Sequence, residues 1–166
     1  VWFGYASVVL TDIQGSMEFD LIIITHDRVL MVELKEWSGK LTSYDGNWYI
    51  NDKYRSKSPY DVKRNQALRL KSILQTELAH NLGYCPWVEA HVVLCGSATP
   101  EYLSTSERRY VHTLQEFLTI HEQEAYSRIT VSQEFDFFKG KRRDRPTAPK
   151  CKQAFDDFFR GLNFVQ

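Results

Sequence analysis

The chain has 166 residues, of which 43% are hydrophobic and 14% aromatic, so it can fold around a core. Its 21 basic and 21 acidic residues cancel, which excludes attraction of a polyanion by bulk charge and leaves that role to local basic clusters. No apolar run approaches the ~20 residues that span a bilayer, and three scattered cysteines without a Cys-x-x-Cys pair favour a cytoplasmic protein without a zinc site.

Strand-like patterns dominate the first third of the chain. Predicted strands cover residues 5–14, 18–24 and 29–35, and a hairpin with its turn at Asp45-Gly46 covers residues 39–50. The middles of the second and third strands are nearly continuously apolar, which is typical of strands buried on both faces. Thr25 to Arg28 predicts a tight turn, and the polar, basic residues 51–58 predict a loop.

Helices and strands alternate in the remainder. Pro59 opens a helix that is expected to end near Leu82, before Gly83. The later predictions are a strand over 88–95, a helical turn over 100–103, a short strand over 110–112, a helix from an N-cap at Thr113 to Ile120, a basic loop over 139–150 and a closing helix over 151–160. Residues 121–138 carry no clear pattern. This order indicates an α/β fold with a mixed central β-sheet flanked by helices, in a single domain over residues 1–166.

Two carboxylates and a lysine stand at the ends of the second and third strands. If His26 and Asp27 form a two-residue turn, paired residue numbers sum to 53, so Asp20 opposes Glu33 and Glu18 opposes Lys35. Opposed Cβ atoms lie roughly 4.5–5.5 Å apart, where like charges destabilise a pair unless a cation such as Mg²⁺ lies between them. The alternative is an exposed Asp20 and a surface ion pair of Glu33 with Lys35, although the apolar neighbours favour burial.

The helix from Pro59 contributes a further candidate. Gln66 lies on its apolar stripe, where an apolar residue is expected, and Arg69 is one turn away. The stripe consists of Val62, Leu70, Ile73, Leu74 and Leu78. Gln66 is either a structural amide satisfied in the core or a side chain directed at the carboxylates, where it would hold a water or a phosphate oxygen.

Basic residues cluster most densely between positions 139 and 145. The candidate contacts to a nucleic-acid backbone there are Lys139, Lys141, Arg142, Arg143 and Arg145, with Lys63 and Arg69 as candidates on the helix. A solvated loop without a partner is an equally good interpretation of the run. The five histidines show no ligand spacing, so each is expected to be a surface or structural residue.

Several motifs in this order resemble one known family. They are Asp20, Glu33-Leu34-Lys35, Trp37-Ser38-Gly39, Asp45-Gly46-x-Trp48 and Ser58-Pro59 followed by Gln66. Together they resemble the nuclease-related domain (NERD), a branch of the PD-(D/E)XK nuclease superfamily, over roughly residues 5–120. The resemblance implies a restriction-endonuclease-like core and a hydrolase that cleaves DNA phosphodiesters with Mg²⁺, for which Mn²⁺ can substitute, in DNA processing or defence against foreign DNA.

The resemblance also implies roles for individual residues. Asp20, Glu33 and the Leu34 carbonyl would bind the metal, Lys35 would position or deprotonate the attacking water, and Gln66 would assist from the helix. Family members usually carry a helix with a Gly-Glu pair before the first strand, whereas this chain starts at Val1 in strand-like sequence. We therefore expect a fragment of a longer protein, with a basic extension over residues 121–166 and with a kinase, helicase or zinc-binding module elsewhere.

A second hypothesis comes from a different functional class. The chain could be a nuclease-like module that binds nucleic acid or a partner without cutting, as a regulatory part of a larger protein. The complete set of Asp20, Glu33 and Lys35 favours the nuclease, because a module that does not cut has no need of it. The late start of the chain favours the non-cleaving module.

Overall fold

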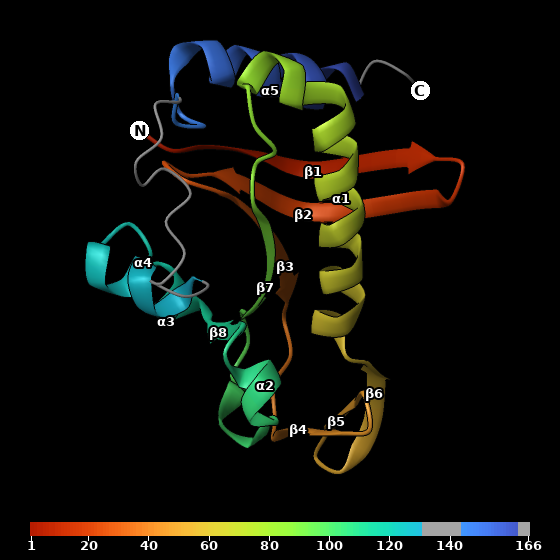
Figure 1. Cartoon of the computed structure of the whole chain (residues 1–166). Helices are drawn as coiled ribbons and strands as arrows, with labels where there is room; N and C mark the ends of the chain where they lie inside the picture. The colour runs from red at the N-terminus through yellow and green to blue at the C-terminus, as the bar shows by residue number, and fades with distance from the viewer. Residues whose placement is uncertain (131–143, 163–166) are drawn as a thin grey trace. The chain divides into compact units, whose positions relative to one another are not determined.

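The computed structural model describes residues 1–130 and 144–162, with eight strands and the helices that connect them (Figure 1). The strands are β1 (Phe3–Asp12), β2 (Gly15–Ile24), β3 (Val29–Lys35), β4 (Leu41–Tyr44), β5 (Asn47–Ile50), β6 (Lys53–Lys57), β7 (Val88–Leu94) and β8 (Val111–Thr113). The helices are α1 (Pro59–Leu82), the 3₁₀ turn η1 (Pro100–Tyr102), α2 (Thr105–Arg108), α3 (Leu114–Phe117), α4 (Gln123–Ile129) and α5 (Pro149–Leu162). None of these described helices is long and apolar enough to cross a membrane.

The strands form two sheets. The larger has the order β1-β2-β3-β7-β8, and the smaller has the order β4-β5-β6. In the larger sheet, β1, β2 and β3 pair antiparallel whereas β7 and β8 pair parallel, so the sheet is mixed. The α/β class with a mixed sheet is therefore confirmed, and it is consistent with a restriction-endonuclease-like core.

The chain divides into two compact units. The first contains Val1–Val32, Gln66–Glu89 and helix α5, and the second contains Glu33–Asn65 and the chain from Ala90 through α4. The boundary between the units runs through β3, α1 and β7.

In the first unit, β1 and β2 form a long hairpin whose register runs from Phe3↔Ile24 to Asp12↔Gly15. Helix α5 lies against β1 (Figure 1), with the Tyr5 and Phe159 ring centroids 4.7 Å apart. Packing of the apolar face of α5 against the hairpin explains why this amphipathic segment is helical.

The turn between β2 and β3 has the predicted form. Leu21 pairs with Val32 and Ile24 with Val29, so paired residue numbers sum to 53. Arg28 at the end of the turn is buried, and its Nη1 donates to Glu89 Oε1 at 2.7 Å. Asp27 accepts two further hydrogen bonds from the same guanidinium. Breaking such a buried pair by removing one partner typically costs ~3–5 kcal/mol, so this cluster holds the beginning of β3 in place.

The core of the second unit surrounds Trp48, which is fully buried. The β4–β5 turn has positive φ at both central residues, 50° at Asp45 and 75° at Gly46, as a type I′ hairpin turn requires. Thr113 caps α3, because its Oγ1 accepts from the Glu116 backbone N–H at 3.2 Å. That helix ends at Phe117, earlier than the predicted Ile120, because Leu118 to Ile120 continue in turns.

Helix α1 has the predicted boundaries, Pro59 and Leu82. Ser58 precedes it, and its Oγ accepts from the Asp61 backbone N–H at 3.2 Å, while Gly83 follows with a φ of 78°. The predicted apolar stripe holds at Leu70, Leu74 and Leu78, which are buried, but Val62 is 41% exposed and does not belong to it.

The expectation of a loop over residues 51–58 was wrong. Residues Lys53–Lys57 form β6, an edge strand of the smaller sheet. Four of its five residues are exposed, so it lacks the alternation of apolar and polar side chains that marks a half-buried strand. Helix α4 also forms in a stretch where no pattern was evident, and it buries Ala125, Tyr126 and Ile129.

Candidate functional site

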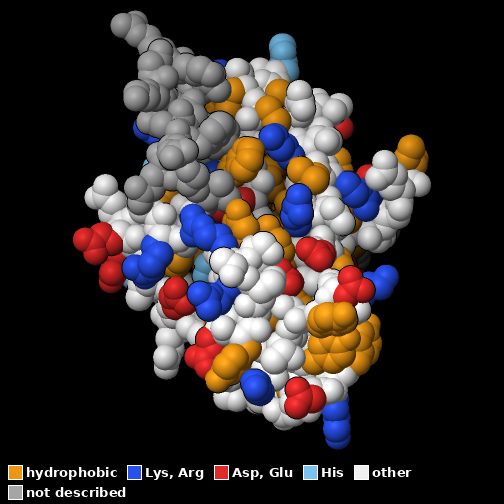
Figure 2. Space-filling model, turned by 60° about the horizontal axis from the view of Figure 1, so that its bottom comes forward, with side chains coloured by type: hydrophobic (Ala, Val, Ile, Leu, Met, Phe, Trp, Pro, Cys, Tyr) orange, Lys and Arg blue, Asp and Glu red, His pale blue; other side chains and the backbone are white. Residues whose placement is uncertain are grey.

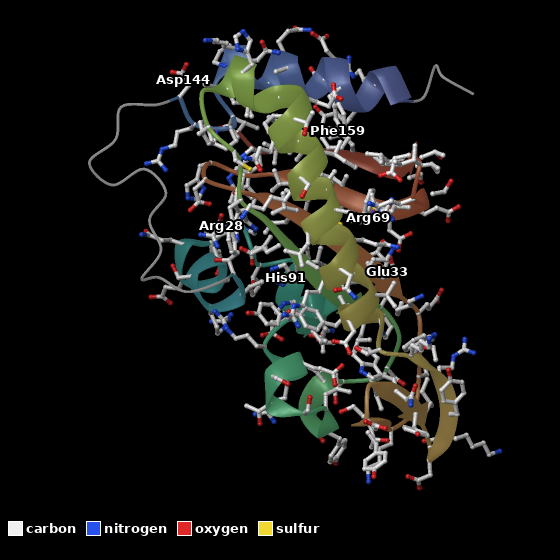
Figure 3. All side chains as sticks on the ribbon, turned by 45° about the vertical axis from the view of Figure 1, so that its right-hand side comes forward. Arg28, Glu33, Arg69, His91, Asp144 and Phe159 are labelled. Atoms are coloured by element: carbon white, nitrogen blue, oxygen red, sulfur yellow. The ribbon has the colours of Figure 1, made fainter. Side chains whose placement is uncertain are left out.

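Glu33 lies between two lysines in the second unit. Its Oε1 is 3.3 Å from Lys35 Nζ, and its Oε2 is 3.2 Å from Lys63 Nζ. The side chains of Glu33 and Lys63 are each 12% exposed, and that of Lys35 is 31% exposed. Figure 3 shows Glu33 beside the beginning of α1, from which Lys63 extends. The two ammonium groups thus contact the Glu33 carboxylate through both of its oxygens, in a place that is only partly open to solvent.

The backbone around Lys35 is held by the segment that follows β7. The Cys95 N–H donates to the Lys35 carbonyl at 2.8 Å, and the Ala98 N–H donates to the Trp37 carbonyl at 3.1 Å. A Cβ on Gly96 would lie 2.1 Å from the Trp37 carbonyl oxygen, so only glycine permits this approach. Glu33, Lys35 and Trp37 therefore have fixed backbone positions, with alternate side chains directed to one side.

Asp20 lies in the first unit and is exposed, contrary to the burial that its apolar neighbours suggested. Its partner position in β1 is Ser7, between the pairs Ala6↔Leu21 and Val8↔Phe19, and the ladder skips that pair. Ser7 has a φ of 54°, which is unusual for a residue other than glycine. Such strained residues concentrate at functional sites. The register confirms pairing only as far as Leu21 and Val32, so the opposition of Asp20 to Glu33 stays a prediction.

The remaining predicted site residues are less informative. Gln66 is half-buried in α1, in the first unit, and the Leu34 side chain is 43% exposed.

Within residues 1–130 and 144–162, no three His, Cys, Asp or Glu side chains gather as metal ligands. The predicted metal donors are all oxygen atoms, from Asp20, Glu33 and the Leu34 carbonyl, and oxygen is the ligand type that Mg²⁺ takes. The chemistry of this donor set fits the cation.

Two of the predicted nucleic-acid contacts are engaged with acidic residues. Lys63 pairs with Glu33, and Arg69 Nη2 donates to Asp12 Oδ1 at 2.6 Å (Figure 3). That hydrogen bond lowers the pKa of the Asp12 carboxyl. Arg145 is exposed. The other four cations of the basic run, Lys139, Lys141, Arg142 and Arg143, lie outside the described residues.

A pair of buried histidines was not predicted as a unit. His91 Nδ1 lies 2.9 Å from His112 Nε2, with His91 on β7 and His112 on β8. Burial, His91 and the guanidinium groups of Arg109 and Arg128 lower the pKa of His112 to about 3. Both rings are buried and lie side by side in the sheet. Their 21-residue separation offered no pairing signal, because neighbouring parallel strands can be any distance apart in sequence.

Comparison with known proteins identifies one family. The model of the nuclease-related domain family matches residues 1–95, which is more than half of the chain and contains Asp20, Glu33, Lys35 and Gln66. No curated protein and no solved structure matches the chain.

Proposed function

The chain belongs to the nuclease-related domain family, and we propose that it is a Mg²⁺-dependent nuclease that hydrolyses DNA phosphodiester bonds. The observation that carries the proposal is the position of Glu33 between Lys35 and Lys63, within the segment that the family matches. A carboxylate that can hold a cation and lysines that can hold phosphate oxygens are the groups that phosphoryl transfer requires.

Each residue has a distinct part in this proposal. Glu33 and the Leu34 carbonyl would hold the cation, with Asp20 as the further carboxylate that the resemblance to the family implies. When bound, a divalent cation neutralises charge on the phosphoryl group and lowers the pKa of a coordinated water. Lys35 positions or deprotonates the attacking water, and Gln66 assists from α1. Lys63 keeps the Glu33 carboxylate in one orientation through the contact to Oε2.

One observation favours the alternative of a nuclease-like module that binds nucleic acid without cutting it. Both carboxylate oxygens of Glu33 are engaged by lysines, so a cation has to displace at least one ammonium group before it binds there. A module that only binds nucleic acid would keep the lysines in place and would use their charge for phosphate contacts. The three free cysteines support a cytoplasmic location for either activity.

Cleavage of a DNA substrate during a Mg²⁺ titration tests the proposal. Glu33→Gln removes the negative charge of the side chain but keeps its shape. We expect this variant to cleave DNA at least about 100-fold more slowly, because losing a residue that only supports a metal ligand already costs up to about 100-fold. Glu36→Gln is the matched control, because Glu36 is exposed near the end of the same strand, and it should cleave at the wild-type rate.

Two outcomes would count against the nuclease. Wild-type protein that leaves DNA intact at every Mg²⁺ and Mn²⁺ concentration would favour the non-cleaving module. Equal rates for Glu33→Gln and Glu36→Gln would remove Glu33 from the chemistry.

A further inference from the structure

Strand β6 is a row of cations at a sheet edge. Lys53, Arg55 and Lys57 are exposed, and among the described residues none of the three has an ion-pair partner. Lys63 and Arg69, by contrast, are each paired with a carboxylate. The cations of β6 are therefore available to an external anion.

A bulge gives Arg55 a special position in this strand. Trp48 pairs with Ser56 and Tyr49 with Tyr54, so Arg55 is the extra residue without a partner in the ladder. Bulges change the direction of a side chain and occur often next to active sites. The Arg55 guanidinium carbon lies 5.3 Å from the centre of the Trp37 ring.

The Trp37 ring connects β6 with the candidate site. Lys35 Nζ lies 5.4 Å from the centre of the same ring and 3.3 Å from Glu33 Oε1. Trp37 packs edge-on against the buried Trp48, with centroids 6.2 Å apart, so its position is fixed by the core of the second unit. Glu33, Lys35, Trp37 and Arg55 thus form one continuous line of contacts within that unit.

Aromatic side chains are exposed among these cations. Tyr54 is 61% exposed, next to Arg55, and Tyr44 at the β4–β5 turn is 76% exposed. Tyr102 is 53% exposed, and Lys40 Nζ lies 4.8 Å from its ring centre. Figure 2 brings this part of the chain forward and shows exposed hydrophobic side chains with Lys and Arg side chains nearby. Exposed aromatic rings between basic groups are the composition that binds single-stranded nucleic acid, because unstacked bases lie on the rings while cations contact the phosphates.

We propose that β6, Trp37 and Tyr54 form a binding surface for single-stranded DNA that leads along Arg55 to Lys35 and Glu33. Because the bulge at Arg55 shifts the alternation of side chains, Lys53 lies on the Trp48 face of the sheet and Lys57 on the Tyr49 face together with Tyr54. The bound strand therefore runs along the exposed edge, where the three cations contact its phosphates from both faces and Tyr54 stacks on a base. The delivery of the strand to Glu33 and Lys35 rests on the proposed nuclease function, whereas binding to β6 does not.

Binding measured without divalent cations keeps the two claims apart. A fluorescently labelled single-stranded oligonucleotide is titrated in EDTA over a series of salt concentrations, so that cleavage has no influence. Replacement of Lys53, Arg55 and Lys57 by Gln should weaken binding and reduce the slope of log affinity against log salt by about 0.7 per lost contact, about 2 in total. The charge-matched control replaces Lys150, Lys152 and Arg160 of α5 by Gln and should retain the wild-type slope.

The outcomes are decisive in each direction. A β6 variant with the wild-type slope, or an equal loss in the α5 variant, would overturn the proposal, and so would a wild-type protein that binds no DNA at low salt. Wild-type protein that binds through β6 but does not cleave with Mg²⁺ would refute the nuclease and leave this inference intact.

Tyr54→Ala tests the choice of single-stranded DNA. Tyr54 is exposed, so its removal should not disturb folding. We expect its loss to weaken binding of the single strand about tenfold, a typical cost of one lost base stack, and to leave binding of a duplex unchanged. Equal affinities of wild type for single strand and duplex, with no effect of Tyr54→Ala, would contradict the assignment.

Discussion

Gly96 is the residue whose lack of a side chain matters most for the position of Lys35 and Trp37. In Gly96→Ala, the added Cβ would lie 2.1 Å from the Trp37 carbonyl oxygen and 2.7 Å from its carbonyl carbon, both backbone atoms. We expect a loss of roughly 1–3 kcal/mol in the free energy of unfolding, as for overpacking in a core, measured by urea denaturation.

The control for this substitution is Gly161→Ala. Gly161 lies in α5, and apart from its chain neighbours and the adjacent helix backbone no described atom lies within 4 Å of the added Cβ. Alanine is the better helix former by about 1 kcal/mol, so this variant should be as stable as wild type or more so. Equal stability of both alanine variants would show that the backbone at Gly96 can move away from Trp37 at little cost, so that it does not fix the position of Trp37.

The buried His112 predicts a pH-dependent stability. Its pKa of about 3 in the folded protein lies below the value of about 6.5 expected when the chain is unfolded. The unfolded chain therefore binds the proton first, so stability is complete above pH 6.5 and falls as the pH drops toward 3. The slope from this one group reaches at most about 1.4 kcal/mol per pH unit.

Urea denaturation at pH 7.5 and pH 5 measures this effect. His112→Gln, whose side-chain amide can still bond to His91, should lose much less stability between the two pH values than wild type does. His80→Gln replaces an exposed histidine and should retain the wild-type dependence. A His112→Gln protein with an unchanged pH dependence would place the sensitivity elsewhere.

Several site residues could be found from the sequence, but their partners could not. Glu33 and Lys35 share a strand face because side chains alternate, and the structure joins them at 3.3 Å. Lys63 is 30 positions from Glu33, and no local pattern links a helix side chain to a strand. Asp20 lies in an apolar strand, and its neighbours therefore suggested that it is buried. The hydrophobic pattern could not show that Asp20 is exposed or that Ser7, across from it in β1, has a positive φ.

At the scale of elements, Glu107 joins three parts of the second unit. Its Oε2 accepts hydrogen bonds from Trp48 Nε1 on β5 and from Ser58 Oγ before α1, each at 2.6 Å, and its Oε1 accepts from Ser104 Oγ at 3.0 Å. Trp48 and Ser58 are fully buried. The carboxylate thus fixes the beginning of α1, which carries Lys63, relative to the β4–β6 sheet.

Removal of this carboxylate should be costly. In Glu107→Ala, two buried donors lose their acceptor, and each unsatisfied group costs about 1–3 kcal/mol. Glu107→Gln is the matched control, because its amide oxygen can still accept from Trp48 and Ser58 while its amide NH₂ group donates to Ser104 Oγ. Thermal unfolding should show a large loss for the alanine variant and a small one for the glutamine variant. A small loss in both would mean that water replaces the carboxylate.

Elements with strong local signals were predictable, and those held by tertiary contacts were not. Ser58, Pro59 and Gly83 mark the ends of α1, and Asp45-Gly46 marks the β4–β5 turn. Strand β6 has no such signal, because an exposed edge strand of basic residues reads like a loop and is stabilised by pairing with β5. The exposed cations of β6 were therefore not recognised as a strand, whereas the DNA contact assigned to the basic run at 139–145 stays a prediction.

At the scale of the whole molecule, the motifs predicted both the mixed α/β fold and the family. Asp20, Glu33, Lys35 and Gln66 could be located because each belongs to a strand or helix with a clear hydrophobic pattern. The division into two compact units was not predictable, since its boundary crosses β3, α1 and β7, where the hydrophobic patterns continue without a break. The prediction that Asp20 and Glu33 bind one cation is accordingly tested by measurements of metal binding and DNA cleavage.

The rate of single-turnover DNA cleavage by Lys35 variants tests the nuclease claim most directly. Lys35 lies within 3.3 Å of Glu33 and is assigned to the attacking water or the phosphate. We predict that Lys35→Ala lowers the rate by roughly 10²–10⁴-fold, as for lost proton-transfer catalysis, while Mn²⁺ affinity is largely retained. Lys35→Arg should not restore activity, because a guanidinium differs in shape and cannot be deprotonated. Cleavage at a near-wild-type rate by either variant would contradict the account and return Lys35 to a surface ion pair.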